Sequence, residues 1–153
     1  MSYGEVRHYL EKQGLTPLEF EESSATVELA ALAVGCQPAR IAKTMSFLVD
    51  GAATLVVLAG DARIDNPKFK AAFHQKAVML PPERVEELTG FPVGGVCPFL
   101  AGEGVKVYLD ISLKRFDTVF PAAGSRNSAV ELSPARLEEL SHAEGWVDVS
   151  KLS

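Results

Sequence analysis

The chain has few of the residues from which proteins build metal centres and disulfide frameworks. It contains two cysteines, Cys36 and Cys97, and three histidines, all widely separated in the sequence. Neither a CxxC pair nor a closely spaced pair of histidines occurs, so we predict a protein without a bound metal. No other cofactor is expected. The cysteine spacing also gives no sign of a disulfide framework, and the reducing cytoplasm is therefore the expected location.

Long apolar runs and an excess of basic residues are also missing. The longest apolar stretches, such as 54–59, have the length of a strand and are too short to span a bilayer, so no membrane partner is expected. The first residues do not have the pattern of a secretory signal. The net charge is −5, which argues against a protein that coats duplex nucleic acid by bulk electrostatics. A protein that holds one end of a folded RNA through a few local basic residues is compatible with that charge.

Local capping signals predict helices at five points along the chain. Ser24 or Thr26 is a suitable N-cap for a helix that Gly35 ends, and Ser2 is a suitable N-cap for the first helix. The predicted helices cover 2–13 and 26–35 and begin near Asn66-Pro67, Pro81-Pro82 and Ser133-Pro134.

Apolar runs of strand length are interleaved with these helices. Asp50-Gly51 joins two of them and is a strong hairpin signal. Strands are predicted at 18–20, 42–49, 53–59, 77–80, 105–109, 118–121, 129–132 and 146–149. Strict strand–helix alternation is absent, and so is a glycine fingerprint after a first strand, which argues against a dinucleotide-binding fold. We predict one α/β domain over 1–153 with a mixed sheet or an irregular barrel.

Lys43 lies within an apolar segment, 41–49, at the start of a predicted strand. A lysine in such surroundings is partly buried in one interpretation, and then needs an anionic partner such as a phosphate. In the other interpretation it extends from the strand end into solvent. The residues alone leave both interpretations open and favour the second.

The segment 91–99 contains two prolines and two glycines and is otherwise apolar, so no regular helix fits it. A glycine-rich apolar loop lets backbone groups approach a ligand, where they can orient a water or stabilise an oxyanion. A buried turn between strands explains the same pattern. Cys97 lies in this loop, and with no histidine nearby in the sequence it is better explained as a core residue than as a nucleophile.

Three segments together resemble the YbaK/EbsC family, also called the prolyl-tRNA-synthetase-associated editing domain. The first is Arg40-Ile41-Ala42-Lys43-Thr44, and the second is Gly94-Gly95-Val96-Cys97-Pro98. The third combines Val107-Tyr108-Leu109-Asp110 with Ala123-Gly124 and Val130-Glu131-Leu132-Ser133-Pro134. The resemblance extends over 9–144 and rests on the order and spacing of these segments.

This resemblance implies a mixed, barrel-like β-sheet surrounded by helices. It also implies trans-editing, the hydrolysis of the ester between a wrong amino acid and the terminal ribose of a tRNA, usually tRNA-Pro. Lys43 would hold the terminal phosphates or the substrate end, and the Gly94 backbone would orient the substrate or the attacking water. The resemblance further implies substrate-binding roles for Thr26, Thr44, Gly95, Pro98, Ala123, Gly124 and Ser125.

Three positions depart from the Cys-specific branch of that family. Ala122 and Ala129 stand where that branch has a serine and an aspartate, and Thr26 stands where it has an aromatic residue. The expected substrate is therefore Ala or 2-aminobutyrate more than Cys. The expected partners are the acceptor end of a mischarged tRNA and prolyl-tRNA synthetase. Two alternatives stay open: a non-catalytic module that binds the aminoacyl end of tRNA, and a thiol hydrolase that uses Cys97.

Overall fold

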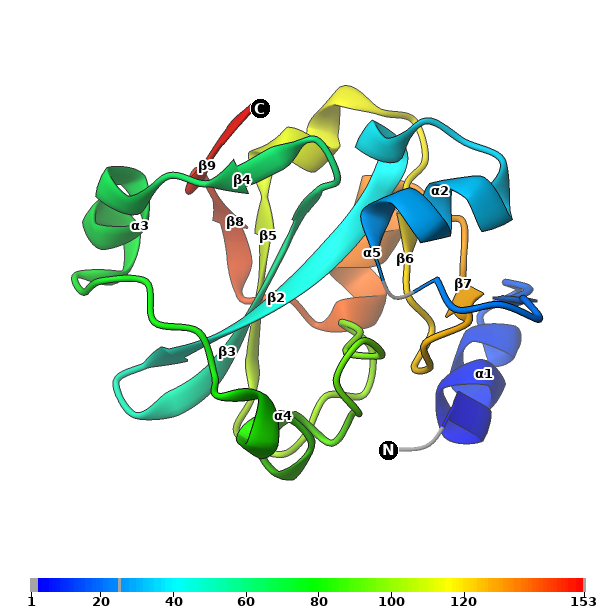
Figure 1. Cartoon of the computed structure of the whole chain (residues 1–153), viewed down its shortest axis with the longest axis horizontal. Coiled ribbons are helices and arrows are strands. Elements are labelled where there is room, and N and C mark those ends of the chain that lie inside the picture. The colour runs from blue at the N-terminus through cyan, green and yellow to red at the C-terminus, as the bar shows by residue number, and fades with distance from the viewer. Residues whose placement is uncertain (1–2, 25, 153) are drawn as a thin grey trace.

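The centre of the molecule is a five-stranded mixed sheet (Figure 1). The structure, a computed structural model, describes residues 3–24 and 26–152. The strand order is β6-β2-β3-β5-β8, in which β2 and β3 are antiparallel and the other neighbours are parallel. The bounds are β2 (Ile41–Val49), β3 (Ala52–Ala59), β5 (Lys106–Asp110), β6 (Phe120–Pro121) and β8 (Gly145–Val147). The sheet is curled like half a barrel and has helices around it, which confirms the predicted fold class.

The long hairpin of β2 and β3 follows the sequence signal at its turn. Asp50 and Gly51 have φ values of 52° and 77°, the left-handed values that a two-residue turn between antiparallel strands requires. The turn makes Val49 the partner of Ala52 and sets the register of the whole hairpin.

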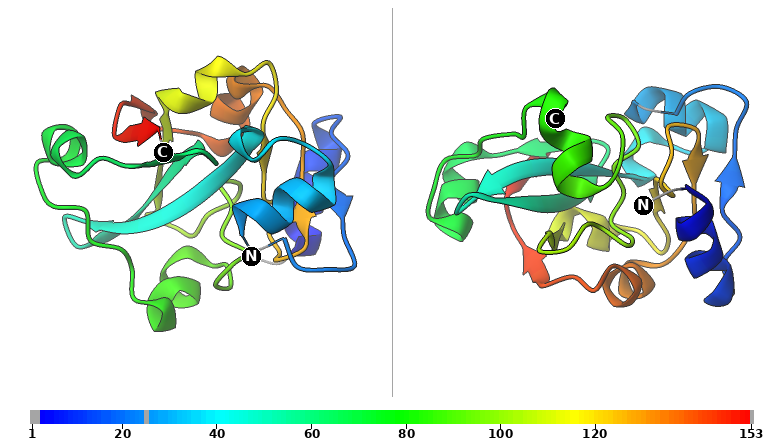
Figure 2. Two further views of the ribbon diagram at one scale, coloured as in Figure 1. Left: turned by 45° about the horizontal axis from the view of Figure 1, so that its top comes forward. Right: turned by 90° about the horizontal axis from the view of Figure 1, so that it is seen from below.

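The helices also begin where the capping residues predict. Thr26 and Ser133 each accept a backbone N–H at the first turn of their helices, and Gly35 ends α2 in the left-handed conformation. Ser2, the predicted cap of the first helix, lies outside the described residues. The helices are α1 (Tyr3–Lys12), α2 (Val27–Val34), α3 (Asn66–Phe73), α4 (Pro82–Thr89) and α5 (Pro134–Ser141), with short 3-10 turns η1 (Pro38–Arg40) and η2 (Ile111–Arg115). Helix α3 lies at one end of the molecule, and α1 and α2 lie at the other (Figure 2).

Several predicted strands are shorter in the structure. The segment 77–80 forms a single bridge, between Met79 and Phe47, because the prolines that follow have no N–H to continue the pairing. The predicted strand at 129–132 is divided between a two-residue strand and a bridge at Leu132. Two small two-stranded sheets complete the fold: β1 (Leu18–Glu19) with β7 (Ser128–Ala129), and β4 (Ala62–Ile64) with β9 (Ser150–Leu152).

Both faces of the hairpin are covered. Phe47 and Val56 lie on one face and pack against Phe69 of α3. Leu55 and Val57 are fully buried in the main core, which receives side chains from α1, α5 and the segment 91–99. No helix among the described residues has the length and apolar character needed to cross a membrane.

Candidate functional site

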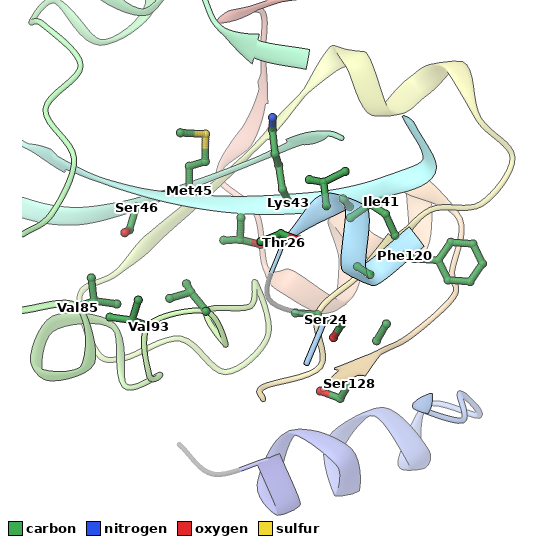
Figure 3. Close-up of a pocket in the computed structure, with 18 of the residues that line it drawn as sticks. Ser24, Thr26, Ile41, Lys43, Met45, Ser46, Val85, Val93, Phe120 and Ser128 are labelled. Carbon is green, nitrogen blue, oxygen red and sulfur yellow. The ribbon is translucent and has the colours of Figure 1, made fainter. Parts of the chain in front are cut away.

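A cavity of about 350 Å³ opens along β2, within the size range of small-molecule sites. Residues of α2, α4, the segment 93–96 and β6–β7 form its other walls (Figure 3). Most of these walls are apolar, with Val27 and Ala30 from α2, Val85 from α4 and Phe120 from β6.

The cavity runs along the edge of β2 and not over one of its faces. Six consecutive residues, 41–46, line it, although successive side chains of a strand point to opposite faces. Figure 3 shows this alternation: Lys43 and Met45 extend to one side of β2 and Ser46 extends to the other. On this edge, β6 pairs only with Ile41 and Ala42, the first two residues of β2. The segment 78–80 pairs with β2 further along the same edge, from Ser46 to Leu48. Within residues 3–24 and 26–152, the edge between these two partners has no covering strand.

Lys43 is a partly buried cation at this open edge. Burial lowers the pKa of Lys43, and the nearby carboxylates of Asp61 and Glu28 raise it by a smaller amount. Asp61 is itself bound by Arg115, with N–O distances of 3.1 and 2.6 Å. No carboxylate of the described residues lies within ion-pair distance of the Lys43 ammonium. The ammonium is therefore available to an external anion, such as a phosphate.

The loop 91–99 has a buried base and an exposed tip. Phe91, Cys97 and Phe99 are fully buried, whereas Gly94 lies at the cavity with a φ of 85°. The Arg126 Nε donates a hydrogen bond of 2.7 Å to the carbonyl of Val93 and holds the loop against the turn before β7. This anchoring keeps the Gly94 backbone at the cavity, and the left-handed φ of Gly94 is one that glycine adopts at no steric cost.

Four of the nine predicted site residues line the cavity together: Thr26, Lys43, Thr44 and Gly94. The other five lie behind its walls. Pro98 and Ala123 are buried, and Gly124 packs against Val6 of α1 with a φ of 102°. Ser125 donates to Ser128, which does line the cavity. Gly95 lies so close to Ser125 that a Cβ on Gly95 would approach its backbone to 3.2 Å. A direct role in binding stays a prediction for all nine.

The predicted site left out three serine hydroxyl groups of the cavity, those of Ser24, Ser46 and Ser128, of which Ser24 had been considered only as a helix cap. The alternation of a strand could have indicated Ser46, which shares a face with Thr44. Ser128 follows a turn whose path no local pattern fixes.

Lys43 is the one titratable side chain among the described residues that line the cavity. Cys97 is fully buried elsewhere, and loss of solvation raises the pKa of its thiol to about 12. This burial argues against the thiol-hydrolase alternative, because the thiolate is the reactive form. No cluster of three or more potential metal ligands occurs among the described residues. The site offers a cation, hydroxyl groups and backbone groups.

The fold and the site thus define a mixed α/β domain with a small apolar cavity beside a cation, Lys43, that has no ion-pair partner in the described part of the chain. The model of the aminoacyl-tRNA editing domain matches residues 21–140, and the chain belongs to this family. It is 56% identical over 134 residues to the uncharacterised protein YwhH of Bacillus subtilis (strain 168), covering 87% of this chain and 85% of that protein. The chain is also 33% identical over 90 residues to the proline–tRNA ligase of Lysinibacillus sphaericus (strain C3-41). This match covers 58% of this chain and 16% of the ligase.

Solved structures agree with this family. A proposed trans-editing enzyme for prolyl tRNA synthetase is 30% identical and has a TM-score of 0.86, covering 97% of this chain and 96% of that one. The hypothetical protein APE2540 is also 30% identical, with a TM-score of 0.84 and coverage of 95% and 99%.

Proposed function

We propose that this chain is a trans-editing deacylase, which hydrolyses the ester between a wrong small amino acid and the terminal ribose of tRNA, with tRNA-Pro as the expected carrier. Family membership supports a role in tRNA editing. The observation that carries the proposal is Lys43, a partly buried cation without an ion-pair partner among the described residues, at the rim of an apolar cavity. An RNA end supplies the anion that this site lacks.

The chemistry divides between the protein and its substrate. Lys43 holds a terminal phosphate and so fixes the ribose ester over the cavity. The backbone at Gly94 orients the substrate or the attacking water. No carboxylate or histidine is among the described residues that line the cavity, so a group of the substrate, such as a ribose hydroxyl, assists in activating the water. Hydrolysis then releases the free amino acid and an intact tRNA.

The walls near β6 and β7 favour a small aliphatic amino acid. Ala122 and Ala129 line the cavity and bring no polar group toward a substrate side chain. Ala and 2-aminobutyrate are therefore the preferred substrates, and Cys is the weaker one. The ligase relative and the trans-editing neighbour support prolyl-tRNA synthetase as a functional partner. The proposed location is the cytoplasm.

A deacylation panel tests the proposal. The purified chain is incubated with labelled Ala-, 2-aminobutyryl- and Cys-tRNA-Pro, with Ser- and Thr-tRNA as further substrates, and release of the amino acid is compared with spontaneous hydrolysis. We expect the largest acceleration for Ala or 2-aminobutyrate. Spontaneous rates for all five substrates would reject the deacylase.

A non-catalytic module that binds the aminoacyl end is the second candidate. The lack of a titratable base among the described lining residues favours it. Saturable binding of Ala-tRNA-Pro without hydrolysis, in the buffer of the panel, would support this module over the enzyme.

A further inference from the structure

The backbone of Thr44 has an unusual place in the sheet. Leu48 donates its N–H to the carbonyl of Val78, and Leu80 donates to the carbonyl of Ser46, so Ser46 and Leu48 direct their backbone groups away from β3. In an antiparallel pair these directions alternate along the strand. Thr44 therefore also directs its N–H and C=O away from β3, toward the cavity.

No other strand among the described residues is paired with these two backbone groups. The pairing of β2 with β6 stops at Ala42, and the pairing with 78–80 begins at Ser46. Thr44 is the outward-facing residue between them. Its Oγ1 is also buried without a hydrogen-bond partner among the described residues. Buried polar groups of native proteins are nearly always paired, so this position is suited to a polar ligand.

We infer that the aminoacyl group of the substrate binds to the open edge of β2 as one residue of an added strand. Its α-amino group donates to the carbonyl of Thr44, and its ester carbonyl accepts the N–H of Thr44. This inference rests on the proposed function and identifies which part of the substrate occupies the edge.

The chemistry of an α-aminoacyl group matches the edge. A strand residue presents an N–H and a C=O on the same side, and an α-amino acid ester has both groups in the same relation. The amino group keeps N–H donors whether or not it is protonated. An acyl group without the amino group keeps the acceptor and loses the donor, so the Thr44 carbonyl would stay unpaired.

Stable analogues separate this inference from the proposed function. We would compare the 3′-alanylamide of 3′-amino-3′-deoxyadenosine with the propionylamide, which lacks only the α-amino group, and with adenosine. The readouts are the dissociation constant and the ¹⁵N–¹H spectrum of the labelled wild-type chain. We expect the propionylamide to bind about tenfold to a hundredfold more weakly. Saturating alanylamide should slow exchange of the Thr44 amide strongly, and the propionylamide should do so only at the higher concentration that its weaker binding requires, because both analogues keep the carbonyl that accepts this N–H.

Gly94 reports whether the cavity is occupied at all. If the Gly94 signal moves with the alanylamide while the Thr44 amide stays unprotected, or if the propionylamide binds equally well, the inference is wrong and the proposed function stands. Protection of Thr44 by adenosine alone would assign the edge to the base and would also overturn the inference. If no analogue moves either signal, the proposed function loses its site and the inference fails with it.

A Thr44→Val variant assigns the contact to the backbone. It removes the hydroxyl and keeps the N–H and C=O. We expect the variant to retain the preference for the alanylamide within about twofold, because this preference comes from the α-amino group and the Thr44 carbonyl; any ligand contact to Oγ1 would weaken both analogues alike. Loss of the preference would show that Oγ1, and not the Thr44 backbone, recognises the α-amino group, which would contradict the inference.

Discussion

The Lys43→Met variant tests whether Lys43 serves activity or the stability of the fold. Methionine removes the charge and keeps an unbranched stem. Burial lowers the pKa of Lys43 below its ordinary 10.5, so the folded state binds this proton less tightly than the unfolded state. The charge therefore destabilises the fold at neutral pH. Because the side chain is partly exposed and screened, we expect the variant to be as stable as the wild type or up to about 1 kcal/mol more stable.

The pH dependence of this difference has a defined sign. Below the folded-state pKa both states carry the proton, and the cost of the buried charge is complete. As pH rises toward 10.5, the unfolded-state value, the folded protein loses the proton first and the wild type regains stability. Urea unfolding of both proteins at neutral pH and near pH 10 should show the variant's advantage shrinking. A difference that grows with pH would contradict the assignment of the pKa shift.

Activity should change in the opposite direction to stability. A hydrogen bond between charged groups contributes about 1.5–3 kcal/mol, so kcat/KM for deacylation should fall by about tenfold to a hundredfold in the Lys43→Met variant. Lys12→Met, at an exposed position at the end of α1, is the matched control and should keep full activity. Activity within twofold of wild type would remove Lys43 from the site. Loss of activity together with more than about 2 kcal/mol of stability would make its role structural.

Three further substitutions test other parts of the structure. Cys97→Ala should keep full deacylase activity, because a thiol with a pKa of about 12 holds its proton at neutral pH, and a clear loss would revive the thiol hydrolase. Gly60→Ala should lower the free energy of unfolding by more than about 2 kcal/mol, since a Cβ there would lie 2.0 Å from the carbonyl oxygen of Pro38. Gly145→Ala, where nothing lies within 4 Å of an added Cβ, is the control, and equal melting of the two variants would contradict the packing at Gly60. Asp110→Asn should lower the free energy of unfolding by about 1–3 kcal/mol, measured in urea. The buried Asp110 carboxylate accepts two backbone N–H groups and one hydroxyl, and the NH₂ of an asparagine would face one of these donors. An unchanged free energy of unfolding would refute this prediction.

The local signals of the sequence predicted most of the regular elements. Thr26, Ser133 and Asp50-Gly51 act through contacts within a few residues, so their effects can be read without tertiary information. The segment 77–80 was predicted as a strand and forms one bridge, because the proline pair after it limits how far it follows β2. Strand length there depends on a neighbour that the local pattern does not contain.

The site was predictable only in part. Lys43 and Gly94 drew attention through composition and a family resemblance, and both line the cavity. The open edge at Thr44 could not be predicted, because it depends on where β6 stops pairing with β2. Burial of Pro98 behind the wall likewise depends on the course of the loop, which its glycines and prolines leave undetermined. Periodicity indicates which residues form a strand, but it does not indicate which segments lie beside the edge of that strand.

The most direct measurement is a single-turnover assay with excess protein and Ala-tRNA-Pro labelled in both the amino acid and the tRNA. Binding and release of alanine are followed in the same sample, beside the Lys43→Met variant. The account predicts that alanine is released from bound tRNA much faster than from free tRNA, that the tRNA stays intact, and that the variant loses most of this rate. Complete binding with alanine released only at the spontaneous rate would contradict the deacylase and leave a binding module.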